Sequence, residues 1–189
     1  MRRSERGFTL VEAMVVVAFL AILSTLAIVY VRPSTKPIDV AQRFANLVQE
    51  ASRLAVRHGP VRWDVAEALG ERRRTRIVGG VVDSSVIFTI EVLEEDAGAP
   101  TAVWRPVQQM TVPSSVTADS YATTAGTYAT VTHETSWPSF TLSCYPSGSC
   151  SAATLFFSVE RGPTQDRQAR VAVLPLGTAT FVKNDWNAY

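Results

Sequence analysis

The sequence predicts an α+β protein in which a long N-terminal helix precedes a head of antiparallel β-sheet. Residues 10–31 are mostly apolar and carry a single charge, an acid, and residues 38–58 repeat apolar side chains every three or four positions. After Pro60, short β-branched segments alternate with Gly, Pro, Ser and Asp. Helical segments followed by a run of strands are typical of a helix packed on antiparallel sheet.

The first segment has the length and composition of a membrane span. Leu10–Val31 is 22 residues with Glu12 as its one charge, and a helix of that length covers roughly 33 Å. Arg2, Arg3 and Arg6 precede it, which predicts a cytoplasmic leader and export of the rest. A buried core helix and a cleaved secretory signal are the alternatives. The apolar run is longer than a usual signal core, and no small-residue cleavage site ends it.

The junction before the apolar segment resembles a known processing site. Residues 7–12 read Gly-Phe-Thr-Leu-Val-Glu, similar to the class III signal of type IV pilins and type II secretion pseudopilins. The resemblance implies that a membrane-embedded prepilin peptidase cuts after Gly7 and methylates Phe8, which makes Glu12 the fifth mature residue. Loss of the leader removes three Arg and one Glu, so the net charge changes from +1 to −1.

Glu12 is expected to act in assembly. An ionised carboxylate in hydrocarbon costs ~2.5–3.5 kcal/mol on insertion scales, so something must offset that cost. Cleavage creates a charged amine at Phe8, which can pair with Glu12 of the same chain or of a neighbour in a staggered filament. An acid tolerated near the membrane interface is the alternative.

A second helix is predicted over Ile38–His58, after two prolines at positions 33 and 37. The prolines favour a kink or local unwinding over residues 32–37, and the end of the membrane helix is the alternative. Gly59-Pro60 ends the second helix. Its apolar stripe, expected to face a sheet, consists of Ala41, Phe44, Ala45, Val48, Ala51 and Ala55, widened by Leu47 and Leu54.

The rest of the chain is predicted to form the β-rich part of the head. Trp63–Leu69 is a short helix or an irregular connection, and Pro113–Thr127, rich in Ser, Thr and Ala, is expected to be an exposed loop. The predicted division is leader 1–7, membrane and assembly helix 8–31, amphipathic helix 32–60 and globular head 61–189. The expected strands are Arg76–Val82, Val86–Leu93, Ala102–Val107, Tyr128–His133, Phe140–Cys144, Thr154–Glu160, Arg170–Leu174 and Thr178–Lys183.

The C-terminal block resembles the GspH/FimT/FimU group of minor pilins and pseudopilins. Leu155–Val159, Arg170–Val173 and Leu176–Ala179 are similar to the final hairpins of that group. The group often has a Gly followed by Arg-x-Arg near its end, whereas Gly177 is followed here by Thr-Ala-Thr.

Cys144 and Cys150 are the only cysteines, and they are expected to form a disulfide in an exported head. The five residues between them include a Pro and a Gly, which suit a tight turn. A metal site would need more ligands, and the chain has only two histidines, far apart in sequence. We therefore predict no metal and no cofactor.

A basic run, Arg72-Arg73-Arg74 followed by Arg76, is a candidate contact for DNA or for a partner protein. Some FimT-like pilins bind DNA. Glu71 and the near-neutral net charge argue against a dominant nucleic-acid surface, which favours a solvated turn or a subunit interface.

The sequence as a whole favours a minor type IV pilin that primes assembly or lies near the pilus tip, with no catalytic residue. The resemblance implies a prepilin peptidase and other major and minor pilins as partners. It also implies an inner-membrane stage with the head in the periplasm. The alternatives are an H-type pseudopilin of type II secretion, a DNA-binding minor pilin and, from another class, a membrane-anchored envelope enzyme. The enzyme is disfavoured because the sequence has no nucleophile elbow, HExxH motif or phosphate loop.

Overall fold

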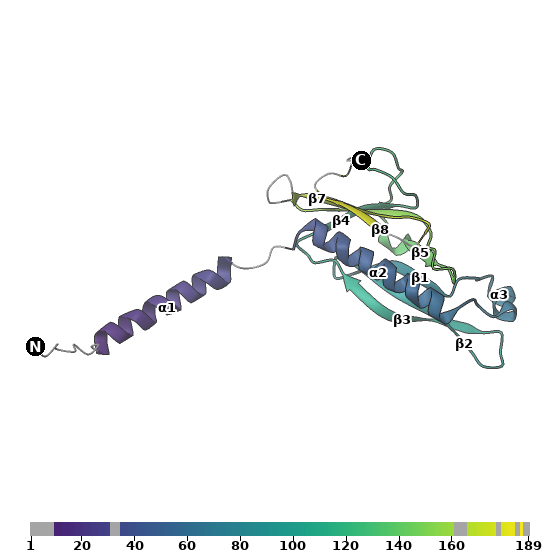
Figure 1. The fold of residues 1–189 in the computed structure, drawn as a ribbon, viewed down its shortest axis with the longest axis horizontal. Helices are drawn as coiled ribbons and strands as arrows, with labels where there is room; N and C mark the ends of the chain where they lie inside the picture. The colour runs from purple at the N-terminus through teal and green to yellow at the C-terminus, as the bar shows by residue number, and fades with distance from the viewer. Residues whose placement is uncertain (1–9, 31–34, 161–165, 177–178, 184–185, 187–189) are drawn as a thin grey trace, which may run out of the picture. The chain divides into compact units, whose positions relative to one another are not determined.

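The protein is described by a computed structural model covering residues 10–30, 35–160, 166–176, 179–183 and Trp186. Side chains are described for these residues except 25–30 and 180–183. The chain forms two compact units, residues 1–34 and 35–189 (Figure 1). The first contains one helix and the second contains the α+β head, so the predicted fold class is confirmed.

Two long helices lie where the apolar patterns predict them. Helix α1 spans Leu10–Tyr30, and helix α2 spans Pro37–His58. Pro37 occupies the first turn of α2, where its missing N–H costs nothing. The Asp39 carboxylate accepts a hydrogen bond from the Lys36 backbone N–H at 3.1 Å, which caps the helix. The expected kink falls largely on residues 31–34, which lie outside the described residues.

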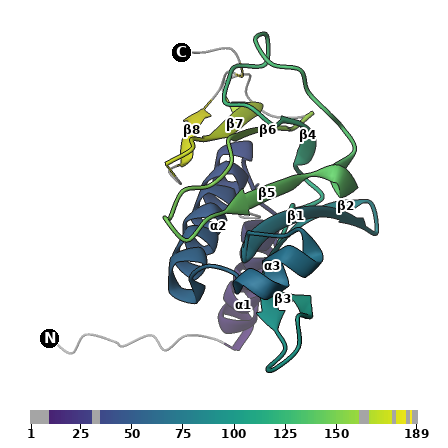
Figure 2. The same cartoon turned by 90° about the vertical axis from the view of Figure 1, so that its right-hand side faces the viewer.

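Helix α2 is the centre of the head core. Every residue of its predicted apolar stripe from Ala41 to Ala55 is buried, and Leu54 is partly buried against the same core. Both β-sheets pack on this helix (Figure 2). The polar residues Gln42, Arg43 and Asn46 remain exposed. The 3.6-residue period therefore placed the buried face of α2 correctly.

The first sheet is antiparallel and has the order β3-β2-β1-β5. A two-residue turn, Asp83-Ser84, joins β1 to β2, and both residues have positive φ, as a tight hairpin turn requires. Pro106 and a register shift at Ile90/Glu91 interrupt the pairing of the edge strand β3. The strands are β1 Thr75–Val82, β2 Ser85–Glu95, β3 Ala102–Thr111 and β5 Thr141–Cys144.

The second sheet is also antiparallel and has the order β4-β6-β7-β8. Leu155, Phe157 and Val171 point from it into the main core. The chain passes between the two sheets at the β3–β4, β4–β5 and β5–β6 connections. The strands are β4 Thr117–Ala122, β6 Ala153–Ser158, β7 Gln168–Val173 and β8 Ala179–Lys183.

Aromatic rings fill the space between α2, the first sheet and the segment before β5. Phe44 of α2 lies edge-on to Phe88 of β2, with 4.9 Å between ring centroids. Phe140 packs against both rings, and Trp137, in the short 3-10 helix η1 (Trp137–Ser139), meets Phe88 at 5.4 Å. A smaller cluster lies under helix α3 (Trp63–Leu69) and consists of Val61, Val65 and Leu93.

Two expectations about the middle of the chain were wrong. Pro113–Thr127 was expected to be a loop, but residues 117–122 form β4 and Tyr121 is buried. Tyr128–His133 was expected to be a strand, but it is a turn-rich segment outside both sheets. The short stretch Trp63–Leu69, left open between helix and irregular connection, is helix α3.

Candidate functional site in the N-terminal segment

Helix α1 exposes large apolar side chains around its surface. Leu10 is 78% exposed, Met14 66% and Phe19 63%, and no described residue of the helix between Leu10 and Ser24 is buried. The hydroxyl of Ser24 donates to the Leu20 carbonyl at 2.7 Å, which satisfies a polar group within the helix itself. A helix that is apolar all round needs cover from lipid or protein.

Glu12 lies in the first turn of α1 and is exposed. A negative charge in the first turn interacts favourably with the unpaired backbone N–H groups and the helix dipole, typically by about 0.3–1 kcal/mol. Gly7 and Phe8 lie outside the described residues. The pairing of Glu12 with the new amine therefore stays a prediction.

Among the residues with described side chains, no helix is long and apolar enough to cross a membrane. In α1 these side chains end at Ser24. The membrane span expected over residues 10–31 therefore stays a prediction.

The arginine cluster lies at the start of β1, and Arg73 is bound within the head. Its guanidinium donates to both carboxylate oxygens of Glu71, at 2.7 and 3.0 Å, and to the Ser143 hydroxyl at 2.9 Å. Burial raises the pKa of the Glu71 carboxyl, but the hydrogen bonds from the Arg73 side chain and backbone outweigh it and leave that pKa below its usual value. The charge of Arg73 is thus neutralised locally.

Arg74 and Arg76 also form ion pairs within the head. Arg74 pairs with Glu95 at 2.9 Å and donates to the His58 carbonyl at 2.8 Å, which ties the end of α2 to the first sheet. Arg76 pairs with Glu91 at 2.8 Å and lies over the Trp104 ring, with Cζ 3.9 Å from the ring centroid. Their main contacts lie within the head.

Arg72 differs from its neighbours. It is exposed and makes no ion pair with any residue that the structure describes. In the basic run, three guanidinium groups therefore make contacts within the head, and the guanidinium of Arg72 is exposed to solvent.

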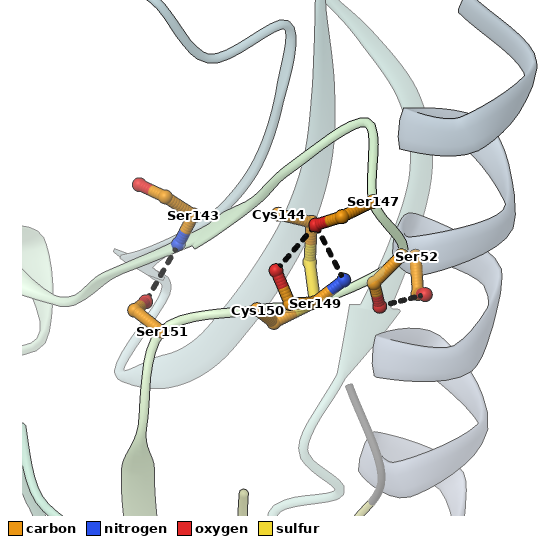
Figure 3. The surroundings of a disulfide bond; sticks show 8 residues. Ser52, Ser143, Cys144, Ser147, Ser149, Cys150 and Ser151 are labelled. Carbon is orange, nitrogen blue, oxygen red and sulfur yellow. Dashed lines mark hydrogen bonds between the residues drawn. A yellow bond between two sulfur atoms is a disulfide. The ribbon is translucent and has the colours of Figure 1, made fainter. Parts of the chain in front are cut away.

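Cys144 and Cys150 form the disulfide that the sequence predicts, and both are buried (Figure 3). The enclosed turn is also closed by backbone hydrogen bonds, Tyr145 N–H to Ser149 O at 2.8 Å and Gly148 N–H to Tyr145 O at 2.9 Å. Gly148 has φ +83°, which favours glycine there. This turn connects β5 of one sheet with the segment leading to β6 of the other.

The disulfide turn is also attached to α2. The Ser52 hydroxyl donates to the Gly148 carbonyl at 2.7 Å, as Figure 3 shows beside the helix. A Cβ at position 148 would meet a methyl group of Val56 at 3.4 Å. The turn thus holds the crossover between the sheets against the central helix, which is a structural task.

Comparison with known families decides what the N-terminal segment is. Residues 2–28 match the prokaryotic N-terminal methylation motif. This motif is the signature of type IV pilins and pseudopilins. It covers the basic leader, Gly7, Phe8 and Glu12, so the predicted resemblance is confirmed at this level.

The methylation motif indicates a structural subunit that is processed by a prepilin peptidase and assembled with other pilins. It does not distinguish a minor pilin from a pseudopilin. No curated protein and no solved structure matches the chain.

Sequence reasoning missed the polar and aromatic contacts on the far side of the second sheet. Arg170 is 1% exposed, and Trp186 reaches back from near the C-terminus to the backbone of β6 and β7. Arg170 had been treated only as a strand residue. Apolar neighbours on both sides of that charge were the available signal that it is buried.

Proposed function

We propose that this protein is a minor type IV pilin, cut between Gly7 and Phe8 and methylated at Phe8. It first spans the inner membrane once, with its head in the periplasm, and then joins the pilus near the tip as a priming or structural subunit. The observation that carries the proposal is the N-terminal methylation motif over residues 2–28.

Two further features support assembly through α1. The helix exposes apolar side chains along its described length, which gives it a surface for lipid or for neighbouring helices. Glu12 supplies the one charge on that surface, in the first turn. The amine created at Phe8 offers a partner of opposite sign, and a mismatched axial register would leave a charge unpaired in an apolar setting.

We therefore expect Glu12→Ala to leave leader removal intact and to lower incorporation into filaments at least tenfold. The mass of the protein in membranes checks cleavage and methylation, and immunoblotting of sheared filaments checks incorporation. Met14→Leu, which changes another exposed site of the same helix but keeps an apolar side chain of similar size, is the matched control and should incorporate normally. Normal incorporation of Glu12→Ala would refute the assembly role of Glu12 while leaving the cleavage site untouched.

An H-type pseudopilin of type II secretion is the second candidate, because the same motif fits both machines. Deletion of the chain distinguishes them. Loss of surface pili with normal protein secretion supports the minor pilin, and the reverse result supports the pseudopilin. A protein that keeps residues 1–7 in the cell would contradict both and would favour a membrane-anchored envelope enzyme.

DNA uptake is a less favoured role for the head. Three of the four guanidiniums in the basic run have carboxylate partners, so few free cations remain for phosphates. Salt-dependent DNA binding that is lost on changing Arg72, Arg73 and Arg74 to Ala would reverse this view.

A further inference from the structure

The second sheet buries side chains on the face that points away from α2. Leu155, Phe157 and Val171 face the main core. Phe156 of β6 and Arg170 of β7 alternate with them along the strands, and they lie opposite each other in the β6–β7 pairing. Phe156 is 0% exposed, and Arg170 is 1% exposed although it carries a charge. Something other than α2 must therefore cover this outer face.

Residues 123–133, which we call the strap, provide that cover. The Thr154 hydroxyl donates to the Thr124 carbonyl at 2.8 Å and accepts from the Gly126 N–H at 3.1 Å. The Arg170 guanidinium donates to the Gly126 carbonyl at 2.7 Å. Side chains of β6 and β7 thus hold the first part of the strap by its backbone.

The second part of the strap is held by Trp186. The Trp186 carbonyl accepts a hydrogen bond from the Tyr128 N–H at 3.1 Å, and the two rings stack with centroids 4.6 Å apart. The Trp186 indole N–H lies within hydrogen-bonding distance of the carbonyls of Phe157 and Ala169, at 3.1 and 3.2 Å. Trp186 therefore bridges the strap and two strands of the sheet.

The strap begins and ends beside the same strand. It follows Ala122, the last residue of β4, and Glu134 after it exchanges two backbone hydrogen bonds with Tyr121 at 2.9 and 2.7 Å. Loops whose ends are close together can open as units while the scaffold stays folded.

We propose that Trp186 is a latch: it holds the strap over Phe156 and Arg170, and its release opens the outer face of the second sheet while α2 and the main core stay intact. The fold thereby contains a local closure that depends on the contacts of Trp186. The opened face presents aromatic rings beside a guanidinium.

The test uses the full-length protein in detergent and compares Trp186→Ala with Trp63→Ala. Trp63 is 77% exposed on α3, so its loss is a matched control for removing an indole. Chymotrypsin cuts after exposed aromatic residues, and Tyr128 lies within the strap. We expect Trp186→Ala to speed cleavage after Tyr128 at least tenfold and to raise amide exchange across residues 123–133. Trp63→Ala should leave both as in the wild type.

Two further variants separate the latch from general destabilisation. Trp186→Phe keeps an aromatic ring but lacks the indole N–H, so its cleavage rate should fall between those of the wild type and Trp186→Ala. Thr154→Val removes the hydroxyl that holds Thr124 and Gly126, and it should loosen the strap while Trp186 is present.

Three results would overturn the proposal. The first is cleavage after Tyr128 at the wild-type rate in Trp186→Ala. The second is equal acceleration in Trp63→Ala. The third is a rise in amide exchange at Phe44 and Ile77 in the main core as large as that in the strap, since this would make the opening global.

Discussion

The arginines at the start of β1 show how a charged run is used inside a small head. Arg73, Arg74 and Arg76 each pair with a carboxylate, and each also contacts a second structural group: a hydroxyl, a carbonyl or an aromatic ring. Hydrogen bonds to charged groups fix geometry more firmly than an isolated surface ion pair does. The run therefore ties the first sheet to the end of α2 and adds a side-chain contact to β5 within that sheet.

The pair Glu71–Arg73 gives a prediction for acid pH. Because the pKa of Glu71 is lowered from its usual value of 4.5 in the folded head, its stabilising effect is present above that value and is lost as the pH falls through the folded pKa. Glu71→Gln should thus destabilise the protein near neutral pH, and this difference in stability should shrink as the pH falls below 4.5. Urea unfolding of both proteins across this range measures the difference. If the difference in the free energy of unfolding between the two proteins did not change with pH, the stabilising effect could not come from the ionised Glu71 carboxylate.

Helix α2 lies in the middle of the main core because its apolar stripe packs against both sheets. Phe44 is fully buried, and its ring lies 4.9 Å from Phe88 and 6.2 Å from Phe140. Loss of such a ring leaves a cavity that a close-packed core refills only in part.

Phe44→Ala should lower the free energy of unfolding by about 3–5 kcal/mol, measured by urea titration of the head. Gln42→Ala, on the exposed side of the same helix, should change it by less than about 0.5 kcal/mol. Equal effects of the two substitutions would mean that α2 is not the centre of the core.

The spacing of apolar residues predicted the bounds of α2 to within one residue and those of most strands to within a few residues. It could do so because one face of each element is buried and the other is not. It failed for β4, whose Ser- and Ala-containing sequence has weak strand preference and pairs with β6, far along the chain. It also failed for Tyr128–His133, where β-branched residues suggested a strand. The Tyr128 N–H is instead bound by the Trp186 carbonyl, a contact that depends on a distant part of the sequence.

The candidate site was predictable to the extent that its chemistry is local in sequence. The leader, Gly7, Phe8 and Glu12 lie within a dozen residues, so one short segment that resembles a known processing signal contains all of them. The contacts of Arg170 and Trp186 join segments more than ten residues apart, and no short motif records them.

The whole molecule divides into a unit around α1 and a head with its own core. Residues 35–189 contain α2, both sheets and the disulfide, whereas the described part of α1 is exposed. The head thus has the apolar contacts that a domain needs to fold independently.

A fragment of residues 35–189 should be soluble and should unfold in one cooperative transition that circular dichroism and tryptophan fluorescence report alike. A fragment extended to Leu10 should aggregate without detergent, because it carries the exposed apolar helix. A non-cooperative transition of the shorter fragment would show that the head needs α1 for its structure.

The turn between Cys144 and Cys150 has a mechanical consequence. It is one of the three connections between the described strands of the two sheets, beside β3–β4 and β4–β5, and a covalent sulfur bond spans it. Tension that crosses this connection therefore passes through that bond, and the five residues in between carry no load. A chain pulled across this turn would keep roughly 16 Å of backbone in reserve, since six residue steps extend to about 20 Å and the two Cα atoms already lie 4.0 Å apart. Reduction of the bond would release it.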